Sequence, residues 1–451
     1  MSIDRKTIAA LSSAPGKAGV AVVRVSGPGA AAALEGLAGR LPRPRVAALR
    51  TLQRAEDGQD IDRAIVLWFP GPSSFTGEDV AEIHLHGGRA VVASVLEALT
   101  ALGCRLAEPG EFARRAFENG KIDLTEAEGI ADLIDAETEA QRVQAIRQAT
   151  GSLNRLYENW RHMLVSAQAL MEAAIDFSDE PDVASDAIAQ SRSVAEDLAA
   201  AISAHLADGR RGEILRDGFR VVLAGAPNAG KSSLLNALAR RDVAIVSPEA
   251  GTTRDVIEVR LDLEGLPVIV SDTAGIRDAG GAIEQEGIRR AYAHGRAADL
   301  VVWMCEATAP IQAVPDDLIG DGHQALLVRS KCDLASGIMA MPRADGDEGR
   351  DVIALSVVTG EGLNDLVRRI AEVARERIAP GESAALTQAR HRAALEECAA
   401  ILGKVLAGDA EQAEIRAEEL RMAAVALGRI TGRIGAEDVL DHVFGRFCIG
   451  K

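Results

Sequence analysis

The sequence predicts a multidomain protein with α/β and all-α parts, in which a doubly wound α/β domain is inserted into a helical domain and an α+β domain precedes both. Three observations support this prediction. Strand patterns mix with a helical pattern in residues 1–119, helical periodicity alone fills 120–217 and 375–451, and apolar runs alternate with helical spacing in 218–374. A chain of 451 residues is long enough for each part to bury its own core.

The first segment carries the pattern of an α+β domain. Three apolar runs predict strands, at residues 20–25 (VAVVRV), 64–68 (AIVLW) and 81–86 (AEIHLH), and residues 90–102 then take up helical spacing. The pattern changes after Pro109. Thr125 and Glu128 have the spacing of a capping box, which predicts the start of a long helical stretch.

Composition limits the classes to which the protein can belong. No apolar run reaches membrane-spanning length and the N-terminus lacks a signal pattern, so we expect a cytoplasmic protein without a membrane partner. The five cysteines are scattered without C-x-x-C spacing, which argues for a reducing compartment and against zinc. The net charge of −17 opposes non-specific binding of nucleic acid, so such a substrate would need a basic partner or a local patch. Candidate patches are Arg40, Arg43 and Arg45, or Arg429 and Arg433; the alternative, which the composition favours for each, is an ordinary solvated surface arginine.

The α/β segment opens on a phosphate-binding pattern. The apolar run at residues 221–223 predicts a strand, residues 225–232 (GAPNAGKS) follow, and helical spacing begins at Ser233. The glycines allow backbone N–H groups to surround phosphates, Lys231 adds a positive charge, and Ser232 offers a hydroxyl to Mg²⁺. This order of strand, loop and helix predicts a P-loop.

Four downstream elements indicate the type of P-loop protein. Residues 251–255 (GTTRD) precede an alternating strand, Glu264-Gly265 makes a turn, and the returning strand ends at 272–275 (DTAG). Two further strand ends carry 330–333 (SKCD) and 356–360 (SVVTG), where a base can be bound at the rim of a sheet. In this order the elements resemble a GTPase of the translation-factor-related class.

Two departures from that class affect binding and catalysis. Ser330 stands where the class has asparagine, which removes the usual contact to guanine N7, while Asp333 remains to accept the N1 and N2 hydrogens of guanine. Ile276 stands where Ras-type switches have a glutamine that orients water. The carboxylates available to place the water instead are Glu284 and Glu286. Arg254 and Arg277 are close in sequence, but the sequence does not place either one unambiguously as an arginine finger.

We expect the nucleotide site to comprise the residues of these five elements: Asn228, Ala229, Gly230, Lys231, Ser232, Ser233, Ser247, Pro248, Glu249, Ala250, Gly251, Thr252, Thr253, Asp272, Thr273, Ala274, Gly275, Ser330, Lys331, Cys332, Asp333, Ser356, Val357 and Val358.

Further motifs lie outside the α/β segment, namely 14–20 (APGKAGV), 24–27 (RVSG), 75–79 (FTGED), 86–88 (HGG), 109–112 (PGEF), 121–128 (KIDLTEAE) and the terminal 447–451 (FCIGK). With these motifs, the chain resembles over its whole length the MnmE (TrmE) family of tRNA modification GTPases. The resemblance implies a homodimer joined through N-terminal domains that bind formyl- or methylene-tetrahydrofolate, and GTP hydrolysis stimulated by potassium.

The resemblance also implies roles for individual residues. The potassium ligands would be Asn228, Thr252 and the carbonyls of Ser247 and Glu249, and the magnesium ligands Ser232 and Thr253. Glu284 would position the attacking water, with Asn228 and Lys231 also catalytic. The folate-binding residues would be Arg24, Glu82, Lys121 and Lys451. Cys448 would be a functional thiol near that site; the alternative is a merely exposed thiol.

The implied function is a GTP hydrolase that acts with an FAD-containing partner of the MnmG type, in a heterotetramer or larger complex. Together they would build a carboxymethylaminomethyl- or aminomethyl-type group at C5 of the wobble uridine of certain tRNAs. Two alternatives remain. One is a regulatory GTPase switch in ribosome assembly or signalling, and the other is an N-terminal unit that transfers one-carbon groups without GTP.

Overall fold

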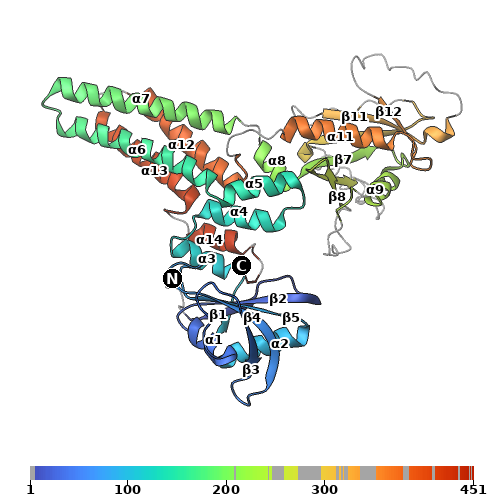
Figure 1. Ribbon diagram of the computed structural model, residues 1–451. Coiled ribbons are helices and arrows are strands. Elements are labelled where there is room, and N and C mark those ends of the chain that lie inside the picture. Colours follow the sequence, from blue (N-terminus) through green and yellow to red (C-terminus); the bar gives the residue numbers. More distant parts are fainter. Residues whose placement is uncertain are drawn as a thin grey trace, which may run out of the picture. The chain divides into compact units, whose positions relative to one another are not determined.

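The computed structural model describes residues 6–207, 210–241, 243–245, 258–272, 296–310, 314–315, 318, 324–335, 352–378, 385–408, 412–434, 437–445, 447 and 449–450 (Figure 1). Contacts divide the chain into two compact units. The first comprises Met1–Ala131, Gln148–Glu196 and Ala400–Lys451, and the second comprises Asp132–Arg147 and Asp197–Ala399. The predicted domain bounds after residues 119, 217 and 374 stay predictions.

A six-stranded sheet forms the N-terminal part of the first unit. Its strands, in the spatial order β3-β4-β5-β2-β1-β6, are β3 (Ala48–Gln53), β4 (Asp60–Phe69), β5 (Val80–Gly87), β2 (Ala18–Ser26), β1 (Ile8–Leu11) and β6 (Arg105–Leu106). Helices α1 (Ala30–Ala38) and α2 (Arg89–Ala101) pack on one face (Figure 1). Strand residues alternate between this buried face and the other, so Val23 and Ile83 enter the core while Arg24 and Glu82 face away from it.

Helices from both ends of the sequence build the rest of the first unit. They are α3 (Glu111–Glu118), α4 (Leu124–Asp135), α5 (Glu139–Ala149), α6 (Ser152–Asp176), α7 (Pro181–Leu206), α12 (Ala389–Ala407), α13 (Ala413–Thr431) and α14 (Glu437–Phe444), of which α4, α5, α7 and α12 continue into the second unit. Helix α6 packs along α13 and buries Leu153, Tyr157, Trp160 and Leu164 at helical spacing (Figure 1). Helices α6 and α13 pack together although the α/β part lies between them in the sequence. The α/β part is therefore inserted into the helical domain, as the sequence predicts.

The predicted capping box at Thr125 and Glu128 is wrong. Helix α4 begins at Leu124, and Asp123 caps it: its Oδ1 accepts the backbone N–H of Glu126 at 2.7 Å, while Glu126 Oε2 accepts the N–H of Asp123 at 2.8 Å. Thr125 and Glu128 are instead buried in the helix.

The second unit is built on another six-stranded sheet, in the order β12-β11-β10-β7-β9-β8. These strands are β12 (Val352–Leu355), β11 (Gln324–Ser330), β10 (Leu300–Glu306), β7 (Phe219–Gly225), β9 (Leu266–Asp272) and β8 (Glu258–Leu263). All neighbours are parallel except β8 and β9, which form an antiparallel hairpin. The described elements of this unit also include helices α8 (Arg211–Asp217), α9 (Lys231–Ala239) and α11 (Leu363–Ile378) and the 3₁₀ turn η3 (Cys332–Leu334), besides the parts of α4, α5, α7 and α12 that continue into it. The predicted fold class is confirmed.

Buried aliphatic side chains hold this second sheet against its helices. Leu223 and Val221 on β7 pack with Leu235 on α9 and Ile370 on α11. This burial supplies the hydrophobic stabilisation of the sheet and fixes where its strands end. None of the helices in the described part of the chain combines the length and apolar character needed to cross a membrane.

Candidate functional site

The loop between β7 and α9 has the backbone conformation that phosphate binding requires. Gly225, Asn228 and Gly230 all have positive φ, at 138°, 65° and 88°. Gly225 also lies against the neighbouring strand: a Cβ added there would be 2.1 Å from the carbonyl oxygen of Met304. Only glycine fits that position, and the resulting turn aims the N-terminus of α9 at the loop.

Lys231 and Ser232, the first residues of α9, provide the polar side chains of this loop. The ammonium group of Lys231 donates to the carbonyl oxygens of Gly225 and Ala226 at 3.0 and 2.9 Å. Lys231 is buried, so its charge lies inside the loop, where the helix N-terminus also favours an anion. The hydroxyl of Ser232 donates to Oδ2 of Asp272, at the end of β9, at 2.5 Å. A hydroxyl and a carboxylate are hard oxygen donors, which is the set that Mg²⁺ takes.

The predicted base-binding loops follow neighbouring strands. Ser330 ends β11, and Lys331 has φ of 58°, which turns the chain into η3 and leaves the side chain of Asp333 exposed. Ser330 itself is buried and donates its hydroxyl to the carbonyl of Cys305 at 3.2 Å. Asp333 is therefore the carboxylate of this loop that is exposed to a ligand.

The second base-binding loop is closed by its own hydrogen bonds. Ser356 is fully buried and its Oγ accepts the N–H of Thr359 at 3.2 Å, while Val358 is 87% exposed.

Burial raises the pKa of the Cys332 thiol, and the carboxylates of Glu361 and Asp333 raise it further, so this thiol stays protonated at neutral pH.

The structure brings the described nucleotide-site residues to one edge of the second sheet, at the carboxyl ends of β7, β9, β11 and β12: Asn228, Ala229, Gly230, Lys231, Ser232, Ser233, Asp272, Ser330, Lys331, Cys332, Asp333, Ser356, Val357 and Val358. Ligands bind at this edge in doubly wound folds. The other predicted site residues of that unit, and two of the first, lie outside the described residues: Ser247, Pro248, Glu249, Ala250, Gly251, Thr252, Thr253, Thr273, Ala274, Gly275, Glu284, Cys448 and Lys451.

In the first unit, Arg24 and Glu82 are cross-strand neighbours on the sheet face that α1 and α2 leave uncovered. Arg24 donates from Nε and from a terminal nitrogen to Glu82 Oε1, at 3.1 and 2.9 Å. The rings of Phe75 and Phe112 lie 5.7 and 5.8 Å from the guanidinium. Phe112 is fully buried and Phe75 is partly exposed, so the Phe75 ring beside the charged pair is the aromatic surface that a flat, polar heterocycle could contact.

Among the described contacts of this unit, Lys121 makes none with the Arg24–Glu82 pair. It packs against the loop that carries Phe75, since a Cβ added to Gly77 would be 3.2 Å from its side chain. The chain end also returns to this unit, where the hydroxyl of Ser12 donates to the carbonyl of Gly450 at 2.9 Å.

A buried ion-pair network supports the loop, and reasoning from the sequence missed it. Arg115 is 2% exposed and pairs with Glu78 at 3.0 Å and with Glu111 at 2.9 Å, and Arg105 also pairs with Glu111. Burial alone would raise the pKa of Glu111, but its hydrogen bonds from Arg105, from the backbone of Glu108 and from Arg115 lower it below its usual value. Glu78 lies in the motif at 75–79 and Glu111 in the motif at 109–112, so these two motifs could have indicated the network.

Two family models match the chain. The model of the MnmE helical domain matches residues 124–448, and the model of the GTP-binding protein TrmE N-terminus matches residues 7–121. The tRNA modification GTPase MnmE of Parvibaculum lavamentivorans is 53% identical over an alignment of 456 positions, which covers 99% of this chain and 100% of that relative. The protein of the same name from Rhodopseudomonas palustris is 51% identical over 448 residues, 99% of each chain. Among solved structures, the G domain of the T. maritima FeoB iron transporter is 26% identical, with a TM-score of 0.25, and covers 34% of this chain and 98% of its own.

Proposed function

The chain belongs to the MnmE family of tRNA modification GTPases, and we propose that it is a potassium-stimulated GTP hydrolase that takes part in modifying C5 of the wobble uridine of certain tRNAs. The group added would be of the carboxymethylaminomethyl or aminomethyl type, with one carbon supplied by tetrahydrofolate. An FAD-dependent partner would supply the redox chemistry.

The observation that carries the proposal is the hydrogen bond between Ser232 and Asp272 beside the buried Lys231. This bond joins α9, the helix that follows the P-loop, to the end of β9. The residues predicted to contact the γ-phosphate come directly after β9 in the sequence. Lys231 would hold the β- and γ-phosphates, and the N–H groups of the loop would bind the same oxygens. Asp333 would select guanine, because adenine has neither the N1 hydrogen nor the 2-amino group that its carboxylate would accept.

Catalysis would depend on charge and water placement, because Ile276 cannot orient a water molecule. Ser232 and Thr253 are the proposed magnesium ligands, and Asn228 with Ser247, Glu249 and Thr252 the proposed potassium ligands. These cations would supply positive charge beside the bridging oxygen as negative charge develops there. Glu284 would position the attacking water through a second water.

For the folate, the proposed residues are Arg24, Glu82, Lys121 and Lys451, with Cys448 as a nearby thiol. The carboxylate of Glu82 suits the donor edge of a pterin, and the partly exposed ring of Phe75 would lie against it. The proposed assembly is a cytoplasmic homodimer bound to the FAD-containing partner. Because the chain carries a net charge of −17, we expect the partner to provide most of the cationic surface for the tRNA.

Nucleoside analysis of tRNA tests this function directly. A strain lacking this chain should lose the modified wobble uridine, the wild-type chain should restore it, and a Lys231→Ala chain should not. Normal wobble nucleosides in the deletion strain would contradict the proposal and favour the regulatory switch.

A further inference from the structure

The hairpin of β8 and β9 connects the nucleotide site to a helical segment of the same unit. At one end, β9 finishes at Asp272, which accepts the hydroxyl of Ser232, and β8 starts at Glu258, shortly after the predicted site motif at 251–255. At the other end, Glu264 and Gly265 form the turn, with φ of 57° and 85°. Both strands are hydrogen-bonded along their length, so the hairpin is stiff between its two ends.

The turn end of the hairpin is bonded to the N-terminus of α5. The backbone N–H of Ala140, in the first turn of α5, donates to the carbonyl oxygen of Gly265 at 3.1 Å. This N–H is one of those that a helix cannot satisfy internally, so the hairpin acts as part of the helix cap. Ala140 also packs against the hydrophobic core beneath the sheet.

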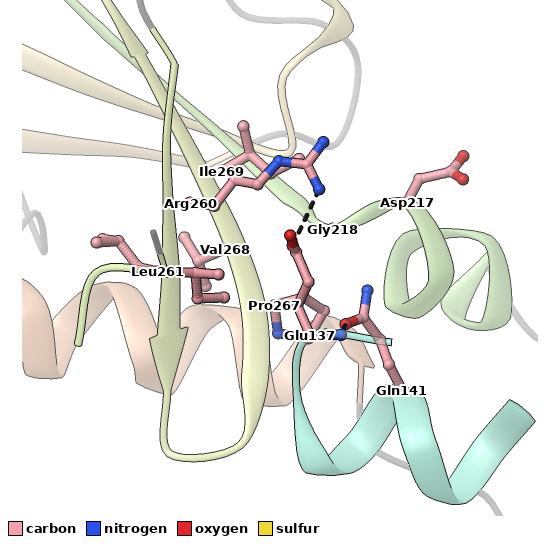
Figure 2. A pocket seen from close by; sticks show the side chains of 10 residues that line it. Glu137, Gln141, Asp217, Gly218, Arg260, Leu261, Pro267, Val268 and Ile269 are labelled. Atoms are coloured by element: carbon pink, nitrogen blue, oxygen red, sulfur yellow. Dashed lines mark hydrogen bonds and ion pairs between the residues drawn. The ribbon is translucent and has the colours of Figure 1, made fainter. Parts of the chain in front are cut away.

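An ion pair forms the second contact. Arg260 on β8 donates to Oε2 of Glu137, just before α5, at 2.9 Å, and Figure 2 shows the two charged groups pointing toward each other. Half of the Arg260 side chain is exposed, so the pair contributes little to stability by itself. The pair instead holds the hairpin in position against the segment before α5. Arg260 lies opposite Ile269 on β9, and Ile269 is three residues before Asp272.

Gln141 makes the third contact and connects α5 to the element that leads into the P-loop strand. Its Oε1 accepts the N–H groups of Glu137 and Thr138 at 3.0 and 3.1 Å, which caps α5, and its Nε2 donates to the carbonyl of Arg216 on α8 at 3.0 Å. Arg216 in turn pairs with Asp132 at 2.8 Å. Gln141, Glu137 and Arg260 line the same small pocket (Figure 2).

We name the three contacts made by Glu137, Ala140 and Gln141 the hairpin clasp. We propose that the hairpin clasp couples the nucleotide site to the segment Asp132–Arg147, so that GDP and GTP states differ in the order of this segment. The inference rests on the proposed binding of GTP at the P-loop. A shift of the β9 end with the nucleotide would pass along the stiff hairpin to the turn, and from there to the cap of α5.

Thermodynamic linkage gives the inference a second, reciprocal consequence. If the nucleotide state changes the clasp, then weakening the clasp must change the relative affinities for the two nucleotides by the same factor. We expect Glu137→Gln and Arg260→Gln each to change the ratio of the dissociation constants for GDP and a non-hydrolysable GTP analogue by about 3- to 10-fold. Neither residue touches the nucleotide site, so a merely structural role would weaken both affinities equally.

The test combines hydrogen exchange with fluorescent nucleotide titration on the full-length protein. Peptides covering 132–147 should exchange differently with GDP and with the analogue, and both single variants should lose at least half of this difference. The charge-swapped variant Glu137→Arg with Arg260→Glu should restore it. Glu139→Gln is the matched control, because Glu139 lies on the same helix and pairs only locally with Arg142 in the described contacts.

The outcomes separate this inference from the proposed function. Failure of the protein to bind either fluorescent nucleotide would overturn the proposed function and this inference with it. Normal binding with identical exchange in both states, or an undiminished difference in both single variants, would overturn the coupling alone.

Discussion

The hydroxyl of Ser232 and the carboxylate of Asp272 are joined by a hydrogen bond of 2.5 Å between the first turn of α9 and the end of β9. Asp272 is 3% exposed, so its carboxylate takes hydrogen bonds from groups inside the site. The two elements that would respond to a bound phosphate are thus already connected through their side chains.

Replacing Ser232 by alanine should therefore weaken nucleotide binding in a magnesium-dependent way. If the hydroxyl is the proposed metal ligand, the affinity for GTP should fall at least about 10-fold with Mg²⁺ present and change little in EDTA. Titration of a fluorescent nucleotide under both conditions measures this. Ser233→Ala is the control, and equal losses with and without Mg²⁺ would show that the hydroxyl does not bind the metal.

Replacing Asn228 should remove the potassium dependence of hydrolysis. Asn228 has φ of 65°, so alanine would add backbone strain of about 1–2 kcal/mol, whereas glycine removes the amide without strain. In Asn228→Gly we expect potassium-stimulated turnover to fall on the order of 100-fold while GTP affinity stays within about 3-fold. Hydrolysis rates in K⁺ and Na⁺ measure it; equal stimulation of the native protein by the two ions would rule out the cation site.

Replacing Glu284 by glutamine should slow turnover without changing binding. A residue that positions the attacking water acts in the transition state, so kcat should drop about 10²- to 10⁴-fold while the GTP dissociation constant stays the same. Single-turnover hydrolysis and nucleotide titration separate the two quantities. Glu286→Gln provides the comparison, and a normal rate for Glu284→Gln beside a slow rate for Glu286→Gln would transfer the role.

The cap of α4 should make stability depend on pH. Burial raises the pKa of Asp123 to about 6, against the opposing hydrogen bonds from Glu126 and Thr125. The folded state thus binds the proton more tightly than the unfolded chain. The stabilisation is complete below the ordinary aspartate pKa and is lost as the pH rises through about 6.

Asp123→Asn should remove this dependence, because the amide oxygen still caps the helix without a charge. At pH 7.5 we expect the variant to be more stable by about 1–2 kcal/mol, and at pH 4 to match the native protein. Melting temperatures of the native protein and the variant, measured from pH 4 to pH 7.5, test this expectation. Glu126→Gln, in the other half of the box, is the control; an unchanged pH dependence in Asp123→Asn would assign it to another group.

The parts that the sequence predicted well are those whose chemistry is local. The strand, glycine loop and helix around Lys231 occur where the pattern places them, and Glu264-Gly265 is the turn of the β8–β9 hairpin, because each depends on a few adjacent residues. The cap of α4 was misassigned because Asp123 and Thr125 each have a glutamate three residues later, and only burial decides between them.

Contacts that depend on tertiary structure could not be predicted. Glu137 and Arg260 are separated by 123 residues, and nothing adjacent to either indicates the other. The pairing of Arg24 with Glu82 depends on the register between β2 and β5, which the alternation of each strand does not fix. The resemblance assigned Arg24 and Glu82 to one site, but it did not predict that they form an ion pair.

The closeness of Gly225 to Met304 has a consequence for the choice of knockout variants. Any side chain at residue 225 would force β7 away from β10 and so disturb the centre of the second sheet. A Gly225→Ala protein that no longer takes up GTP would then report a damaged scaffold instead of a missing phosphate contact. Lys231 is the cleaner position for a chain that folds but cannot hold its substrate.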